Sequence, residues 1–155
     1  MDSVELERRI QLLVEAAGFH LLSANWTPMR GRQMLRVVAD AEDHNITIDE
    51  CADLSRAISD LLDSYPHEFP DYRLEVSSPG LARPLKNWQL QKNIGRTVEV
   101  HYEESEVKRT YRGELIQTDE VEIQVRENDI SRRFPLKDIS DIYVLPTLIK
   151  SQPGK

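Results

Sequence analysis

The side chains that could perform catalysis or bind a metal are few and widely spaced. No two of the four histidines lie at the short spacing of a zinc site; they are His20, His44, His67 and His101. Cys51, the only cysteine, lies beside the apolar stripe of a predicted helix, which favours a packing thiol over a nucleophile. The acidic residues between positions 40 and 49 lack the glycine and the twelfth-position glutamate of an EF-hand loop. We therefore predict no catalytic residue, metal or cofactor, and a hydrolase that uses Ser78 or Cys51 is a minor alternative.

The best candidates for contact with a phosphate backbone are basic residues in two regions. One region is the loop of a predicted hairpin, and the other is the C-terminal half of the chain. The candidates are Arg30, Gly31, Arg32, Lys108, Arg109, Arg112, Arg132 and Arg133. Each is more often a solubilising residue, and only clustering on one face would favour nucleic acid. No aromatic-rich RNA-binding signature accompanies them.

The stretch at positions 74–85 reads LEVSSPGLARPL and begins with the alternation of a half-buried strand. Pro79 and Gly80 suit the two central positions of a type II turn, and the hydroxyls of Ser77 and Ser78 can bond the free amides of that turn. A buried strand that ends in a stiff, polar turn is typical of a boundary between two domains.

The residues before this boundary predict an α-β-β-α-β domain at positions 1–82, with both helices on one face of the sheet. Asp2 and Glu5 form a capping-box pattern, and Gly18 ends the first helix. We expect strands at 19–26, 33–40 and 72–77, a loop at 27–32, and a second helix capped by Thr47 or Asp49. The apolar stripes are Leu6, Ile10, Leu13 and Ala17 in the first helix, and Leu54, Ile58, Leu61 and Leu62 in the second.

The residues after the boundary predict a linker and then a small β domain. We expect the linker at 83–95, with a short helical turn that carries Trp88, Leu90 and Ile94 and packs on either domain; the linker ends at Gly95. Five short strands at 96–149 predict an SH3-like or Sm-like barrel, so the fold class is α+β. Arg132 shares strand parity with apolar neighbours, which requires a bulge or an exposed rim. We expect a disordered tail at 150–155.

The excess negative charge lies entirely in the first part of the chain. Residues 1–85 hold eight Arg, no Lys and 15 acidic residues, whereas residues 86–155 hold 12 basic and 12 acidic residues. Such an acidic half is repelled by naked RNA and suits a basic protein partner. The sequence has no secretory signal pattern and no apolar run of membrane-spanning length, so we expect a cytoplasmic protein that uses no membrane.

The stretch at 74–85 closely resembles the signature of the bacterial ribosome maturation factor P (RimP) family, which usually reads LEVSSPG, two variable positions and RPL. Further similar stretches lie at 35–40, 46–56 and 95–98, so the resemblance covers most of the chain. The sequence departs from the family pattern at Ala82, where an acidic residue is common, and at Ala39, where a larger aliphatic residue is usual.

The resemblance implies a non-enzymatic assembly factor that binds the free or immature small (30S) ribosomal subunit and promotes its maturation. It implies a basic ribosomal protein near the decoding region as a partner, with adjacent ribosomal RNA, and we expect a monomer. The alternative is a stand-alone RNA-binding module, which rests on fold analogy alone. The turn Ser77, Ser78, Pro79 and Gly80 either binds a partner or only fixes the domain junction, and for Arg83 we favour an interdomain salt link over a partner contact.

Overall fold

The computed structural model describes residues 1–80 and 83–146, and the chain divides into two compact units, Met1–Pro79 and Gly80–Lys155. The expected tail at 150–155 and the signature residues Leu81 and Ala82 lie outside the described residues. Within the described part, no helix is both long and apolar enough to cross a membrane.

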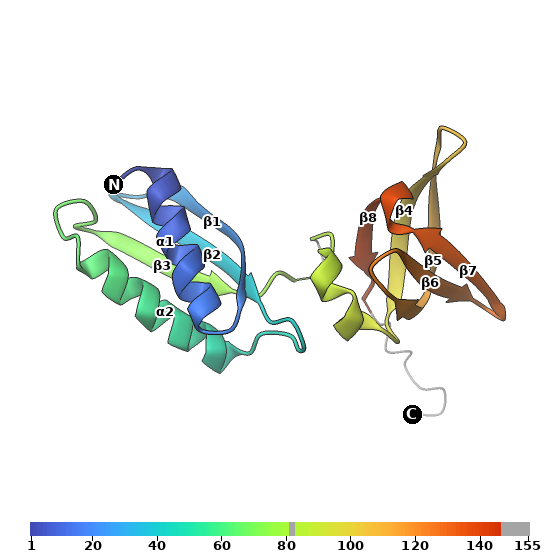
Figure 1. Cartoon of the computed structure of the whole chain (residues 1–155). Coiled ribbons are helices and arrows are strands. Elements are labelled where there is room, and N and C mark those ends of the chain that lie inside the picture. Colours follow the sequence, from blue (N-terminus) through green and yellow to red (C-terminus); the bar gives the residue numbers. More distant parts are fainter. Residues whose placement is uncertain (81–82, 147–155) are drawn as a thin grey trace, which may run out of the picture. The chain divides into compact units, whose positions relative to one another are not determined.

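The first unit has the predicted element order. Its elements are α1 (Ser3–Ala16), β1 (His20–Met29), β2 (Arg32–Asp40), α2 (Ile48–Asp63) and β3 (Tyr72–Ser77). Both helices cover the same face of the three-stranded sheet (Figure 1). The expected loop at 27–32 is wrong, because the two strands continue to Met29 and resume at Arg32. Only Arg30 and Gly31 remain in the turn, where Gly31 has a positive φ of 71°.

Local signals determine where the two helices begin. Asp2 accepts a hydrogen bond from the Glu5 N–H at 2.8 Å, as predicted, but the Glu5 carboxylate pairs with Arg8 and Arg9, so the capping box of the first helix is incomplete. Of the two predicted caps for α2, Thr47 is the one used, and it forms a complete capping box with Glu50. The predicted stripe of α1 needs one correction, because Ala17 lies past the end of the helix and is exposed.

The sheet of the first unit has the order β1-β2-β3, with β2 in the centre. β2 is antiparallel to β1 and parallel to β3, and α2 provides the crossover that a parallel pair requires. The central position of β2 explains its almost continuous burial from Met34 to Asp40. The buried core residues of this unit are Leu6, Ile10, Val14, Leu35, Val37, Ala39, Ile46, Leu54, Ile58 and Leu62.

The second unit contains one five-stranded sheet with the order β7-β6-β5-β4-β8. Its strands are β4 (Thr97–Glu104), β5 (Val107–Thr118), β6 (Glu122–Glu127), β7 (Ile130–Pro135) and β8 (Ile139–Val144). All neighbouring strands are antiparallel. In residues 83–146 the two edge strands, β7 and β8, do not pair with each other, so the sheet is not a closed ladder. The α+β class is therefore confirmed, and the SH3-like or Sm-like barrel stays a prediction.

The predicted linker packs on the second unit. Leu85 donates its N–H to the Ile142 carbonyl at 2.7 Å, and Leu90 is buried in the core of this unit. The expected helical turn consists of two short 3-10 helices, Asn87–Gln89 and Gln91–Asn93. Ile94, which we expected in the packing face, is 38% exposed. Gly95 ends this segment with a φ of 95°, as its position in the sequence predicts.

Candidate partner-binding surfaces

The signature turn follows directly from β3. Ser77 is the last residue of β3 and pairs with Val38, whereas Ser78 and Gly80 are exposed. Gly80 has a φ of 69°, the conformation that the type II turn requires, although the residue that would close this turn lies outside the described part. The expected bonds from the turn amides to the hydroxyls of Ser77 and Ser78 stay a prediction, because residues 81 and 82 lie outside the described residues. Ser78 is exposed to solvent, and Ser77 is half-buried.

A groove, which we call the α2–β3 groove, runs between α2 and β3. It consists of two hollows, of about 490 Å³ and about 730 Å³, which share Ser55 and Leu74 in their linings. The first hollow includes Ser77 and Ser78 of the signature together with Cys51, and the second extends to Tyr72. The groove thus follows β3 along its whole length and reaches the signature turn.

Cys51 belongs to this groove. Burial raises the pKa of its thiol, and the nearby carboxylates of Glu50 and Asp40 raise it further. A raised pKa disfavours the thiolate that a nucleophilic cysteine needs. The structure therefore supports a packing role for Cys51, at the wall of the α2–β3 groove.

The negative charge of the first unit is concentrated around the α2–β3 groove. Residues 48–80 hold eight acidic and two basic residues, a net charge of −6. Asp49, Asp60 and Asp63 are exposed on α2, and Asp71 is exposed just before β3. The electrostatic potential on this side of the unit is therefore negative and favours positively charged groups.

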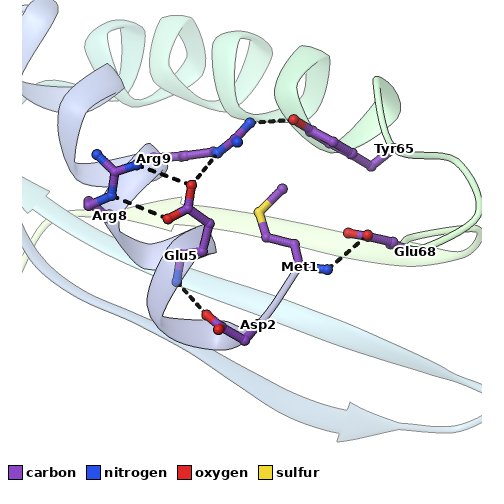
Figure 2. A network of polar contacts seen from close by, with 7 residues as sticks. All are labelled: Met1, Asp2, Glu5, Arg8, Arg9, Tyr65 and Glu68. Atoms are coloured by element: carbon purple, nitrogen blue, oxygen red, sulfur yellow. Dashed lines mark hydrogen bonds and ion pairs between the residues drawn. The ribbon is translucent and has the colours of Figure 1, made fainter.

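Most arginines of the first unit are engaged by its own carboxylates. Figure 2 shows Arg8 and Arg9 with Glu5, and the Arg9 guanidinium also donates to the Tyr65 hydroxyl just after α2. The terminal amine of Met1 contacts Glu68 at 2.8 Å in the same network, which therefore ties the start of α1 to the α2–β3 connection (Figure 2). Three further arginines of this unit also pair with carboxylates. The pairs are Arg32–Asp71 at 3.8 Å, Arg36–Glu75 at 3.5 Å and Arg56–Asp53. Residues 1–80 hold 15 acidic residues and only seven arginines, so a net charge of −8 remains even though most of these arginines are paired.

Four of the predicted phosphate-contact arginines in the second unit also face carboxylates. The pairs are Arg109–Glu104 at 3.7 Å, Arg112–Glu99 at 2.6 Å, Arg132–Glu104 at 2.5 Å and Arg133–Glu122 at 3.6 Å. Arg112 and the His101 ring together lower the pKa of Glu99, with His101 as the larger cause. The structure thus joins Arg109 and Arg132 through one carboxylate and places Arg112 on a different one.

Arg132 lies over three aromatic rings. Its guanidinium carbon is 5.0 Å from the ring centroid of Tyr102, 5.8 Å from that of Tyr111 and 4.9 Å from that of Phe134. It also donates to the Tyr102 hydroxyl at 3.1 Å. The β6–β7 register contains no bulge, so a bulge does not explain the strand parity of Arg132; its side chain is 37% exposed and lies over the three rings. These aromatic contacts were not predicted from the sequence, although Tyr102 and Tyr111 lie in the same predicted β domain as Arg132.

A hollow of about 580 Å³ lies beside Arg132, between the β4–β5 turn, β7 and the start of β8. Three of the predicted basic residues line it, namely Lys108, Arg132 and Arg133. Its lining holds four basic and four acidic residues, so their formal charges cancel. Three predicted basic residues therefore do lie together, but the neighbouring carboxylates cancel the positive charge that nucleic acid would need.

The remaining predicted residues do not line this hollow. Arg30 is in the β1–β2 turn of the first unit, and Arg83 has a polar partner and follows the gap in the described residues. Across residues 1–80 and 83–146, no three side chains of His, Cys, Asp or Glu come together as a metal site would need. His44 instead lies between Asp43, at 2.6 Å, and Glu50, at 2.8 Å.

A protein-family model matches most of the first unit. Residues 9–82 match the model described as the RimP N-terminal domain, a match that extends from α1 through β3 to the signature turn. All of the first unit's helices and strands, apart from the first six residues of α1, lie within this matched region together with the LEVSSPG stretch. Residues 9–82 are therefore a RimP N-terminal domain, from the family that the signature at 74–85 indicated.

Proposed function

We propose that this protein is a non-enzymatic assembly factor that binds the free or immature small ribosomal subunit and promotes its maturation. The observation that carries the proposal is the RimP N-terminal domain match over residues 9–82. The net charge of −6 over residues 48–80 supports a basic partner for the first unit, and the family resemblance implies that this partner is a ribosomal protein near the decoding region. The protein would act in the cytoplasm as a monomer.

The second unit has the complementary part in this proposal. Its sheet would form an SH3-like or Sm-like domain, and its rim of Arg109, Arg112 and Arg133 would meet ribosomal RNA or protein next to the first contact. The balanced charge of the hollow beside Arg132 argues against strong independent RNA binding by this unit. The signature turn, Ser77 to Gly80, would contribute to the contact of the first unit because it borders the α2–β3 groove.

Gradient sedimentation tests the proposal. The full chain, added to a low-salt bacterial lysate, is expected to migrate with free small subunits and to be absent from assembled ribosomes. Migration only at the top of the gradient would remove the claim of subunit binding. The alternative, a stand-alone RNA-binding module, predicts tight binding to isolated RNA that weakens steeply with salt. We expect binding to isolated RNA to be weak at every salt concentration.

A further inference from the structure

We propose that the free edge of β3 and the adjacent α2–β3 groove bind an extended basic segment of a protein partner as an added β-strand. This inference rests on the proposed function and specifies how the first unit holds its ribosomal protein. An extended peptide can add to a sheet edge through main-chain hydrogen bonds, while its alternate side chains enter pockets beside the edge.

The two edges of the first sheet differ in how they are protected. β1, one edge, contains a register shift between Leu21 and Ser23 and carries Pro28, two features that discourage pairing with another strand. β3, the other edge, keeps a regular register with β2 over all its pairs and contains no proline. Among the described strands β3 pairs only with β2, so its outer backbone groups have no partner strand. β3 is therefore the receptive edge.

The groove provides places for side chains of the added strand. Tyr72, Leu74 and Val76 alternate along β3, face the helices and are only half-buried. The α2 side of the groove presents Ser55 at the point where the two hollows meet, and Ile48, which is 88% exposed, at one end. A bound strand would cover these apolar surfaces with every second residue.

The surrounding charge specifies the composition of the partner segment. Residues 48–80 carry the net charge of −6, and Asp60, Asp63 and Asp71 are exposed on α2 and at the start of β3. Since β3 is six residues long, the matching segment has about six residues, in which aliphatic side chains alternate with Lys or Arg. The aliphatic residues enter the groove, and the basic residues remain beside the carboxylates.

Two substitutions block the groove without touching the core. Ser55→Arg places a long cation where the two hollows meet, and Ala52→Arg does so at an exposed position of the first hollow. Gln11→Arg is the matched control, because it adds the same charge at an exposed position of α1 that lines neither hollow. Circular dichroism and thermal unfolding of the full chain show whether each variant is folded.

Purified free small subunits serve as the probe. We expect Ser55→Arg and Ala52→Arg to weaken co-sedimentation by about tenfold or more, while Gln11→Arg binds like the wild type. Because Cys51 is the only cysteine and lines the groove, its alkylation by N-ethylmaleimide reports on the groove alone. We expect alkylation of Cys51 to slow about tenfold or more in the complex and the amides of β3 to become protected from hydrogen exchange.

The outcomes separate this inference from the proposed function. If the wild type and both groove variants co-sediment equally, or if Cys51 and the β3 amides in the bound protein react as fast as in the free protein, the strand-addition inference is wrong and the proposed function stands. If the wild type itself does not co-sediment, the proposed function fails and the inference fails with it.

Discussion

Replacement of Arg132 tests whether this residue supports the second unit or serves a partner. The guanidinium lies within 5.8 Å of three ring centroids, donates to the Tyr102 hydroxyl at 3.1 Å and pairs with Glu104 at 2.5 Å. Arg132→Met keeps most of the aliphatic stem and removes only the charge and its donors. The decrease in the free energy of unfolding therefore measures the contribution of these polar and cation–π contacts.

The magnitude follows from these contacts. A partly exposed cation–π contact is worth about 0.5–1 kcal/mol, a hydrogen bond about 1 kcal/mol and an exposed ion pair about 0.2–1 kcal/mol. The Arg132 side chain is 37% exposed, which places the ion pair at the lower end of its range. Because contacts that share one group are not additive, we expect Arg132→Met to lower the free energy of unfolding of the second unit by about 2 kcal/mol.

The neighbouring arginine provides the control. The Arg133 side chain is 71% exposed and reaches Glu122 only at 3.6 Å, so Arg133→Met is expected to change the free energy of unfolding by less than about 0.5 kcal/mol. Urea unfolding should be followed by the NMR amide signals of β4–β7, because each unit has its own core and a whole-chain signal would average the two. Equal effects of the two substitutions would refute the structural role of Arg132.

Three further predictions concern single features of the fold. Gly113→Ala should lower the free energy of unfolding of the second unit by about 1–3 kcal/mol in the same urea assay, because its Cβ would lie 2.5 Å from the Arg126 carbonyl oxygen; an effect below that range would contradict the clash. Thr47→Ala should lower the free energy of unfolding of the first unit by about 1 kcal/mol, measured from the amide signals of α2, since it removes the side-chain half of the capping box with Glu50. The hydrogen bond to Glu50, with a second to the preceding aspartate, raises the pKa of His44, so its stabilisation should be present at low pH and be lost as pH rises through that raised pKa. An NMR titration of the His44 ring should give a pKa above about 6.5, and Glu50→Gln should lower it; an ordinary pKa in the wild type would contradict the contact.

The helices of the first unit could be predicted because their signals are local. A cap and its partner lie three residues apart, as for Asp2 with Glu5, and the apolar stripe repeats within the same helix. The one error in the stripe of α1, Ala17 in place of Val14, arose at the helix end, where the same spacing continues past the last helical residue. Periodicity alone contains no signal for that end.

The candidate surfaces could be predicted only in part because their partners are distant in the sequence. The signature turn was visible as a string of residues, but the parallel pairing of β3, which leaves it as an edge, depends on contacts with β2 more than 30 residues away. The sequence showed that Arg132 occupies a strand position expected to be apolar. Its partners could not be predicted, because Glu104 and Tyr102 lie 28 and 30 residues before it. No pattern in the sequence fixes such pairings before the sheet order is known.

The ion pairs of the second unit determine which arginines remain able to exchange partners. Arg109, Arg112 and Arg133 have side chains that are 53%, 66% and 71% exposed, and exposed pairs of this kind are worth only about 0–1 kcal/mol each. A phosphate can therefore replace their carboxylates at little cost. Arg132 would in addition lose its contacts with three rings, so it is held in place. Among the four predicted arginines of this unit, a phosphate contact would therefore fall to Arg109, Arg112 or Arg133 rather than to Arg132.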